Sequence, residues 1–419
     1  MIQRCIQCGA TYPLERVLYT CAACGDLLEI AVDAEDVRRL PTGAASGEVA
    51  GGPRPARGPA TTLAAGSAGA AGGVWRYAAA LPVEAAQAIS LGEGATRLHR
   101  CERLGRELGV DALYVKTEGD NPTGSFKDRG MTVGVTQARR IGAQSVACAS
   151  TGNTSASMAA YAAKAGLEAV VLVPDGKIAM GKLAQAVAHA ARIVQIAGNF
   201  DDAMRLVQEL SSGDGRTYLL NSINPFRLEG QKTLAYEVCD TLGDAPDTIV
   251  LPLGNAGNIS AIWKGICEFH LAGRISRRPR MIGVQAAGAA PLAAFLRGQC
   301  REPRMADPET IASAIRIGAP VSWKKAAAAI TDSRGSAESV TDEEILRAQR
   351  DLARLEGLFV EPSSATPIAW LRRERPTGLG TVVCVATGHG LKDPDAVLRE
   401  APNITKAGAT LTELRSALG

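Results

Sequence analysis

Short apolar strands alternate with segments of helical length through most of the chain after Val74, and this pattern constrains the fold more than any other feature. One helix fits between most neighbouring strands. Such alternation is typical of parallel sheets in an α/β protein, where ligands bind at the carboxyl ends of the strands. The expected strands are Leu113–Lys116, Ser145–Ala149, Ala169–Val173, Ile193–Ile196, Thr217–Leu220, Thr248–Leu253, Met281–Gln285 and Thr381–Ala386.

Length and charge narrow the class of protein. A chain of 419 residues exceeds the usual size of one core and predicts two or three units. A net charge of +3 is too small to indicate nucleic acid or a membrane surface as a partner. The N-terminal MIQRCIQCG has no apolar leader, and no apolar run reaches membrane-spanning length. We therefore expect a cytoplasmic globular protein.

Two matched cysteine pairs, CIQCG and CAACG, stand close to the N-terminus. Each pair can place two thiolates on one metal ion, and the glycine that follows lets the backbone turn towards the sulfurs. The pattern predicts a structural zinc ribbon with Cys5, Cys8, Cys21 and Cys24 as ligands. A redox pair is the alternative, but two matched knuckles disfavour it. The remaining cysteines are expected to be reduced and mostly buried.

The stretch NPTGSFKDRG at residues 121–130 places one lysine where a helix is expected to begin. Turn residues come first, Ser125 can cap the helix, and the helix is predicted over Phe126–Arg140. Lys127 then lies in the first turn, where the helix dipole and desolvation both lower the pKa of its amine. A neutral amine is what Schiff-base chemistry requires. A lone lysine in such a turn is more often a surface residue, and only the other loops reverse that preference.

Three expected strands end in unusual loops: STGNTSAS after Ala149, GNAGN after Leu253 and TGHG after Ala386. The small residues of GNAGN let backbone amides converge on an oxyanion at a helix start, although a tight turn is the alternative. The hydroxyls of STGNTSAS suit a carboxylate, although a helix cap is equally compatible.

Two further helical segments carry clear signals. The stretch GKIAMGK at 176–182 imitates a P-loop, but Leu183 stands where a hydroxyl is required, so Lys177 and Lys182 are by default solvated. A later helix is predicted after its cap Thr341, with Glu344 completing a capping box and Gly357 ending it. That later helix is expected to be structural.

Four motifs together resemble the pyridoxal-phosphate enzymes of the tryptophan-synthase β fold, and more closely the threonine synthases. They are SFKDRG, ASTGNTSAS, GNAGN and TGHGLKDP, supported by NSINPFRLEGQKT and EPSSATPIAW, and the resemblance runs from Trp75 to about Pro402. It implies an α/β fold with two parallel-sheet αβα domains and the cofactor in the cleft between them, besides the N-terminal ribbon. The expected domains are a zinc ribbon at 1–40, a flexible linker at 41–73, a large cofactor-binding domain at 74–142 and 219–404, a small mobile domain at 143–218 and a C-terminal tail at 405–419.

The resemblance also implies roles for single residues. Lys127 holds pyridoxal 5'-phosphate covalently and is the catalytic base, and Phe126 lies near the cofactor ring. Asn153 binds the 3-hydroxyl of the cofactor, and Thr387 binds its ring nitrogen. The cofactor phosphate is held by the GNAGN loop, that is by Gly254, Asn255, Ala256, Gly257 and Asn258.

For the substrate, the resemblance implies a phosphorylated amino acid, O-phospho-L-homoserine, which loses phosphate by γ-elimination and gains water at Cβ. Its carboxylate is expected on Ser150, Thr151 and Thr154, and its phosphate on Asn221, Ser222 and Arg227. An arginine suits phosphate because its fork binds two oxygens. Lys177 and Lys182 are weaker candidates for the same phosphate. A homodimer is also implied.

The resemblance leaves some questions open. Ala95 and Arg97 depart from the glycine and proline that relatives usually carry, and Arg97 is expected to reshape the entrance or to add anion affinity. His389 is expected to position its neighbours rather than to transfer protons. The alternatives to a threonine synthase are a related replacement reaction, such as cysteate formation from O-phosphoserine and sulfite, and a catalytically silent binding protein.

Overall fold

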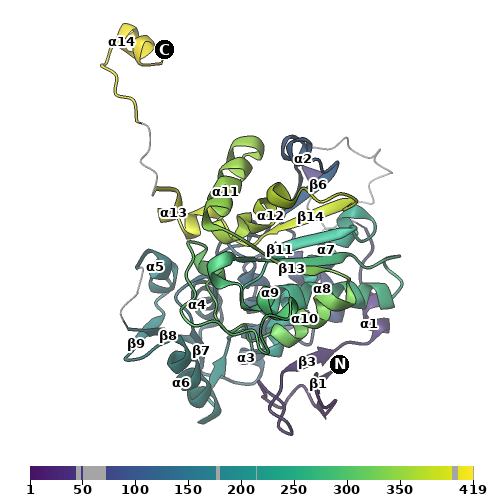
Figure 1. Ribbon diagram of the computed structural model, residues 1–419. Helices are drawn as coiled ribbons and strands as arrows, with labels where there is room; N and C mark the ends of the chain where they lie inside the picture. Colours follow the sequence, from purple (N-terminus) through teal and green to yellow (C-terminus); the bar gives the residue numbers. More distant parts are fainter. Residues whose placement is uncertain (44–48, 51–71, 176–179, 214, 399–403, 419) are drawn as a thin grey trace, which may run out of the picture.

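The computed structural model describes residues 1–43, 49–50, 72–175, 180–213, 215–398 and 404–418 of the chain (Figure 1). It contains two mainly parallel sheets with helices on their faces and a small antiparallel sheet at the N-terminus. The predicted α/β architecture is therefore confirmed. No helix in these described ranges is long and apolar enough to cross a membrane.

The N-terminal ribbon is a three-stranded sheet with the order β2-β1-β3. Its strands are β1 (Ile2–Cys5), β2 (Thr11–Tyr12) and β3 (Leu28–Ala31), and the short helix α1 (Ala34–Arg38) follows. Most of the segment predicted as a linker lies outside the described residues. Within that segment, β4 (Val49–Ala50) pairs with the large sheet.

The large sheet has the strand order β13-β12-β11-β14-β6-β5-β4. Five of its strands run parallel, and β5 joins β6 in the antiparallel sense. The strands are β5 (Leu98–Arg100), β6 (Ala112–Thr117), β11 (Thr248–Pro252), β12 (Arg280–Ala286), β13 (Ser336–Val340) and β14 (Thr381–Ala386). The apolar pattern predicted β6, β11, β12 and β14, but not β5 or β13. Strand β13 has the sequence SAESV, which contains too many polar residues to give an apolar strand pattern.

Helices cover both faces of the large sheet, which explains why its inner strands are continuously apolar. Leu251 belongs to a core cluster with residues of α7 (Pro225–Leu242), α8 (Gly257–Leu271) and α10 (Trp323–Asp332). Its neighbour Val250 belongs to the cluster on the other face. That face is covered by α2 (Glu102–Leu108), α11 (Asp342–Glu356) and α12 (Thr366–Glu374). The short α9 is Pro291–Leu296.

Helix α11 begins and ends as the sequence predicts. The Thr341 hydroxyl accepts a hydrogen bond from the backbone N–H of Glu344, whose carboxylate accepts one from the N–H of Thr341. Gly357 ends the helix in the left-handed conformation. The capping box is thus confirmed.

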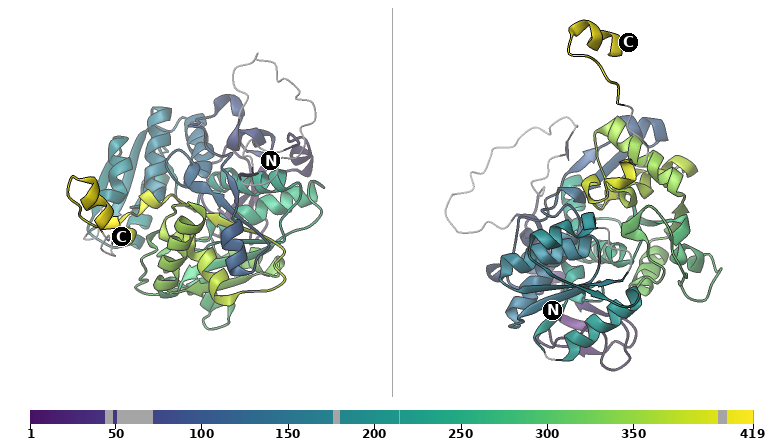
Figure 2. Two further views of the ribbon diagram at one scale, coloured as in Figure 1. Left: turned by 90° about the horizontal axis from the view of Figure 1, so that it is seen from above. Right: turned by 90° about the vertical axis from the view of Figure 1, so that its left-hand side faces the viewer.

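The small sheet has the strand order β10-β7-β8-β9 and is entirely parallel. Its strands are β7 (Ser145–Ala149), β8 (Glu168–Pro174), β9 (Arg192–Ile196) and β10 (Thr217–Leu219). Its helices are α3 (Lys127–Arg140), α4 (Asn153–Ala165), α5 (Met180–Ala188) and α6 (Phe200–Gly213). Both views of Figure 2 show this teal unit to one side of the green and yellow large sheet.

Helix α3 connects the two sheets. Met131 and Val135 belong to the core cluster of the small sheet, whereas Val133 contacts the cluster that contains Phe226 of α7. Close approach of α3 and α7 depends on glycine, because a Cβ at Gly230 would lie 1.7 Å from the carbonyl oxygen of Arg129. The domain boundary placed between residues 142 and 143 stays a prediction.

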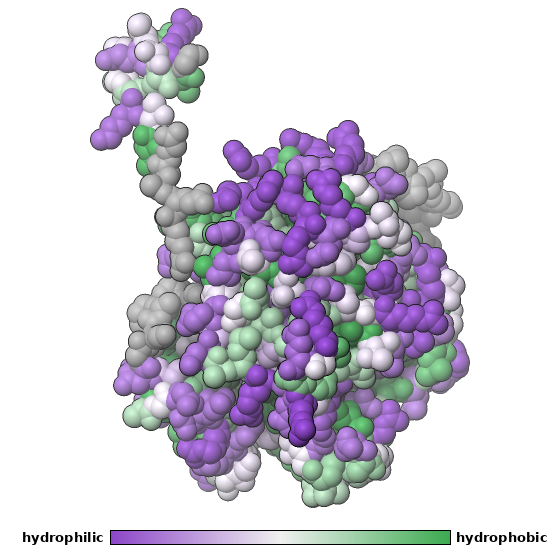
Figure 3. Space-filling view, viewed as in Figure 1, coloured by the Kyte–Doolittle hydropathy of each residue, from purple (hydrophilic) through white to green (hydrophobic). Residues whose placement is uncertain are grey.

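The surface and the C-terminal segment complete the fold. Hydrophilic residues predominate on the face in Figure 3, with hydrophobic ones scattered between them. Helix α13 (Asp395–Leu398) is short, and α14 (Leu411–Leu418) stands away from the body in Figure 1.

Candidate active site

One cavity of about 1020 Å³ lies where the carboxyl ends of β7, β11 and β14 face the start of α3. Apart from the weaker candidates Lys177 and Lys182, it brings together the residues predicted to contact cofactor or substrate, although the role of each stays a prediction. These residues are Phe126, Lys127, Ser150, Thr151, Asn153, Thr154, Asn221, Ser222, Arg227, Gly254, Asn255, Ala256, Gly257, Asn258 and Thr387.

Lys127 is the first residue of α3 and lies inside the cavity. Burial, helped by the positive charge of Arg227 and opposed by the Glu361 carboxylate, lowers the pKa of its amine to about 7. The direction agrees with the sequence prediction, which named desolvation, and the charge of Arg227 is a further cause. The amine lies 4.3 Å from the centroid of the Phe126 ring. The environment of the cavity therefore favours the neutral form of this amine.

The predicted N-cap at Ser125 is wrong. Phe126 occupies the cap position and no side chain caps the helix. The reason is that the preceding residues pair with the TGHG loop: Ser125 forms a β-bridge with Gly388, and the N–H of Phe126 donates to the carbonyl of Thr387 at 3.0 Å. This pairing fixes Lys127 directly beside Thr387. The Ser125 hydroxyl is buried and has no partner within the described part of the chain.

A buried ion cluster lies behind Lys127. Arg129 donates to Glu118 at 2.6 Å and to Glu237 at 2.7 Å, and Lys116 also donates to Glu237, at 2.8 Å. All four side chains are almost completely buried. The cluster joins α3 to β6 and α7, so it holds the helix start in place.

The GNAGN loop offers groups of the kind that bind an oxyanion. Ala256 adopts a left-handed φ of 65°, and α8 begins at Gly257. Both side-chain polar atoms of Asn258, and the Ser322 hydroxyl, are buried without a partner in the described ranges. A Cβ at Gly254 would lie 3.1 Å from the backbone of Ile315. Orphaned donors at a helix N-terminus are what an oxyanion needs.

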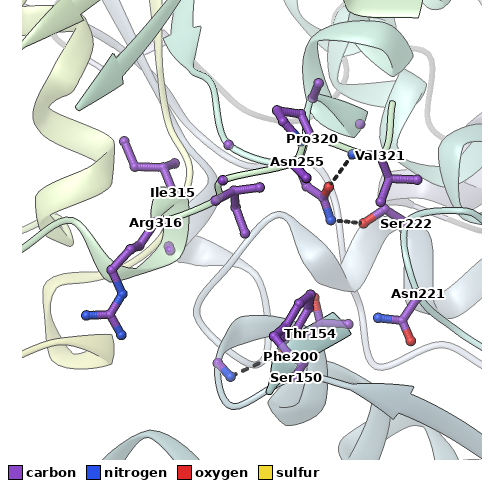
Figure 4. A pocket seen from close by; sticks show the side chains of 18 of the residues that line it. Ser150, Thr154, Phe200, Asn221, Ser222, Asn255, Ile315, Arg316, Pro320 and Val321 are labelled. Atoms are coloured by element: carbon purple, nitrogen blue, oxygen red, sulfur yellow. Dashed lines mark hydrogen bonds between the residues drawn. The ribbon is translucent and has the colours of Figure 1, made fainter. Parts of the chain in front are cut away.

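Asn255 has a different position within this loop. Its side-chain amide donates to the Ser222 hydroxyl at 2.9 Å and accepts from the N–H of Val321 at 2.7 Å (Figure 4). Asn255 therefore ties the loop to two neighbouring segments.

At another part of the cavity, Asn153 and Thr387 meet on one carboxylate that the sequence analysis missed. The Asn153 amide donates to Glu361 at 3.0 Å, and the Thr387 hydroxyl donates to it at 3.3 Å. Glu361 is 3% exposed, and the Ser363 hydroxyl also donates to it. The signal was present in EPSSATPIAW, where a charged residue opens a turn of small residues, but no role was assigned to it.

Hydroxyls and a buried cation line the remaining wall. Ser150, Thr151 and Thr154 surround the start of α4, and Figure 4 shows Ser150 and Thr154 close together. Arg227 lies in the first turn of α7 and is 1% exposed. Its Nε and Nη2 atoms have no partner within the described residues, and burial lowers its pKa to about 10. A buried cation without an anion is costly, so Arg227 is positioned to receive one.

Asn221 lies in the same wall, but its amide is already engaged. It accepts from the N–H of Ala149 and donates to the carbonyl of Ala149, both at 3.0 Å. The side chain thus joins the ends of β7 and β10.

Comparison with known proteins identifies the family. The profile of the family described as "Pyridoxal-phosphate dependent enzyme" matches residues 89–388. The threonine synthase of Methanocaldococcus jannaschii is 50% identical over 427 residues, which cover 100% of this chain and 99% of that protein. The threonine synthase of Mycobacterium tuberculosis strain H37Rv is 53% identical over 321 residues, or 76% of this chain and 87% of that protein.

The chain belongs to the threonine synthase family of pyridoxal-phosphate-dependent enzymes. Solved structures agree on the fold. Maize serine racemase has a TM-score of 0.61 at 20% identity, over 70% of this chain and 88% of that chain. Threonine deaminase isoform 2 of Solanum lycopersicum has a TM-score of 0.58 at 20% identity, over 77% of this chain and 86% of that chain.

The match to the Methanocaldococcus threonine synthase includes the cysteine-rich ribbon, because it spans the whole chain. The sulfur atoms of Cys5, Cys8, Cys21 and Cys24 all lie within 4.8 Å of one another. Zinc–sulfur bonds of about 2.3 Å in a tetrahedron fit such a cluster. None of these cysteines lines the cavity.

Ala95 and Arg97, the two expected departures from the family motif, do not line the cavity. Arg97 is exposed and does not line the cavity, so the structure gives no support to its expected role at the entrance. His389 accepts a hydrogen bond from the N–H of Leu391 at 3.2 Å and packs edge-on against Phe359. This geometry fits a positioning residue. Lys177 and the side chain of Lys182 lie outside the described parts.

Proposed function

We propose that this chain converts O-phospho-L-homoserine and water into L-threonine and phosphate with pyridoxal 5'-phosphate as its cofactor. The proposal rests chiefly on Arg227, whose buried guanidinium has no anionic partner among the described residues and lies in the same cavity as Lys127. The cavity also contains the separate GNAGN loop. With the hydroxyls of Ser150, Thr151 and Thr154 available for the substrate carboxylate, Arg227 supplies a further anion site, which suits a substrate that carries its own phosphate.

The cavity residues offer a binding group for each part of the cofactor. Lys127 would hold it covalently, the GNAGN loop would hold its phosphate, and Asn153 and Thr387 would contact its ring. When bound, the cofactor supplies a sink for the electrons released at the substrate carbons. Glu361 would keep Asn153 and Thr387 in place, since it accepts hydrogen bonds from both.

The substrate would lie between two binding groups. Ser150, Thr151 and Thr154 would hold its carboxylate at the start of α4, and Arg227 with Ser222 would hold its phosphate. Asn221 would act indirectly, because its amide is engaged with Ala149. This arrangement would fix both ends of the substrate and leave the carbons between them within reach of Lys127.

Lys127 would move the protons. Its pKa of about 7 leaves a substantial neutral fraction near neutral pH, so the released amine can accept a proton from Cα. A second proton leaves Cβ, the bond between Cγ and the phosphate oxygen breaks, and Cγ gains a proton. Water then adds at Cβ, where its oxygen forms the hydroxyl while its second proton leaves with the released phosphate, and Lys127 returns a proton to Cα. Lys127 therefore has to serve as anchor, base and acid in turn.

A structural zinc ion on Cys5, Cys8, Cys21 and Cys24 is part of the proposal. The mutual distances of the four sulfurs support it. Its position outside the cavity supports a structural and not a catalytic ion. Metal analysis of the purified protein tests this point, and one zinc per chain is expected.

A cytoplasmic homodimer is also proposed, on the resemblance to the family alone. Sedimentation or light scattering of the purified protein measures the mass, which for a dimer is twice the 43.5 kDa of one chain. A mass of one chain at micromolar concentration would exclude the dimer.

The substrate is tested by measuring phosphate release from O-phosphohomoserine and from O-phosphoserine in parallel, the second with and without sulfite. Release from O-phosphohomoserine with equal formation of threonine is expected. Activity on O-phosphoserine alone would favour the cysteate-forming alternative. A protein that binds no pyridoxal phosphate would favour the silent binding protein.

A further inference from the structure

The zinc ribbon contacts the small sheet through one tyrosine. Tyr19 lies in the loop between the two cysteine pairs, and its hydroxyl accepts a hydrogen bond from the N–H of Leu219 at 2.8 Å. The Tyr19 ring packs against the ring of Tyr218, with 5.8 Å between the centroids. Strand β10 is an edge strand that pairs only with β7 in the sheet order, so this N–H points away from the sheet. The Tyr19 hydroxyl thus accepts the hydrogen bond that this edge amide cannot donate within the sheet.

Leu219 connects this contact to the predicted phosphate site of the substrate. Its carbonyl accepts a hydrogen bond from the side-chain amide of Asn224 at 2.7 Å. The other end of that amide caps α7 by accepting from the N–H of Phe226 at 2.9 Å. Arg227 is the next residue. A short series of hydrogen bonds therefore runs from the ribbon to the helix turn that carries the guanidinium.

The ribbon contacts this turn a second time through its core. Ile30 of β3 is completely buried and belongs to the same apolar cluster as Phe226, Val133 and Trp75. Phe226 is consequently held by its backbone through Asn224 and by its ring against the ribbon. Both restraints act one residue before Arg227.

The part of the ribbon around its second cysteine pair, Cys21 and Cys24, also contacts the large domain. Asp26 forms an ion pair with Lys324 of α10, and Lys325 donates to the carbonyl of Leu28 at 2.6 Å. Tyr19 stands two residues before Cys21, and Asp26 stands two residues after Cys24. A metal ion on this cysteine pair would therefore hold both contacts in one rigid turn.

We infer that Tyr19 is a positioning residue for the anion site at Arg227, so that the ribbon keeps this site in register with the cavity. Tyr19 does not line the cavity and touches no reacting atom. The inference extends the proposed function, and rests on it only for the identity of the anion. Its direct prediction concerns inorganic phosphate bound to Arg227.

The test uses full-length, cofactor-loaded enzyme with the substitution Tyr19→Phe, which removes the hydroxyl and keeps the ring. Tyr114→Phe is the matched control, because Tyr114 lies in β6, outside both the ribbon and the cavity. Affinity for inorganic phosphate is measured by titration calorimetry. Amide hydrogen exchange is followed over residues 217–227, and zinc content is measured to verify that the ribbon is loaded.

Tyr19→Phe is expected to weaken phosphate binding about three- to tenfold, the loss typical of one hydrogen bond. Exchange at Leu219 should become faster, the KM for O-phosphohomoserine should rise by the same factor, and kcat should change less than about twofold. Tyr114→Phe should change none of these. Unchanged phosphate affinity in Tyr19→Phe, even with faster exchange, would overturn the inference, as would an equal loss in the control.

The proposed function can fail separately from this inference. If no variant releases phosphate from O-phosphohomoserine, the substrate assignment is wrong. In that case, phosphate affinity and amide exchange still test whether Tyr19 positions the anion site, because neither depends on turnover.

Discussion

Replacing Arg227 by methionine should weaken binding of the phosphorylated substrate and, without ligand, increase the stability of the protein. The methionine keeps the apolar stem that packs against the Gly134 position of α3, where a Cβ would lie 3.2 Å from Cγ of Arg227. It removes the guanidinium, which has Nε and Nη2 free of partners within the described residues. These two donors are free to bind an anion.

The loss of binding follows from those two free donors. Hydrogen bonds to a charged group contribute about 1.5 kcal/mol or more each, so two of them are equivalent to about 3 kcal/mol, or about a hundredfold. KM for the phosphorylated substrate should rise by about that factor, with a smaller change in kcat. Phosphate-release kinetics measure both values.

The gain in stability follows from the cost of the buried charge. Burial lowers the pKa of Arg227 from 12.5 to about 10, which corresponds to about 3 kcal/mol against the charged form. Without ligand, Arg227→Met should therefore unfold at the same or higher urea concentration than the parent, with a gain of about 1–3 kcal/mol. A variant with unchanged KM, or one that loses several kcal/mol of stability, would refute the assignment of Arg227 as an unpaired anion receptor.

Four further changes have defined outcomes. Lys127→Ala should abolish turnover and the visible absorbance of the lysine-bound cofactor, and any residual turnover above about one part in a thousand would contradict its role as base. Glu361→Gln should lower the pKa of Lys127, because Glu361 is the group that raises it, so the acid limb of the pH–rate profile should move to lower pH. In cofactor-free protein, the folded pKa of about 7 lies below the unfolded 10.5, so the unfolded state binds more protons between these values. The free energy of unfolding of the parent protein, relative to that of Lys127→Met, should therefore be lowest below pH 7 and rise towards pH 10.5. Urea unfolding across that range measures this difference, and a fall with rising pH would contradict the prediction. Cys5→Ser should release the zinc and raise KM as Tyr19→Phe does while largely sparing kcat; full metal retention would contradict the four-cysteine site.

The sequence allowed the cavity to be predicted because parallel strands end at one edge of a sheet. The loops after Leu253 and Ala386 follow neighbouring strands of one sheet and therefore lie at the same edge, whereas the loop after Ala149 belongs to the small sheet and reaches them only through the packing of the two sheets. The position of Lys127 at a helix start and the cluster of four ribbon cysteines could also be predicted from the sequence, because both patterns depend on local spacing.

Other features depend on tertiary contacts and could not be read from local patterns. Arg129 stands in a charged first turn that is typical of solvated helices, yet it is buried between Glu118 and Glu237. Glu361 follows no strand, so nothing in its own segment brings it to Asn153. Ser125 has the right chemistry for a cap, but pairing with Gly388 delays the helix start by one residue.

The most direct test of the proposed reaction is to follow oxygen from isotopically labelled water. Cleavage between Cγ and oxygen with addition of water at Cβ predicts that the label enters the hydroxyl of threonine and that the released phosphate carries none. Label in the phosphate, with homoserine as the other product, would mean that water attacks phosphorus, and would contradict the account.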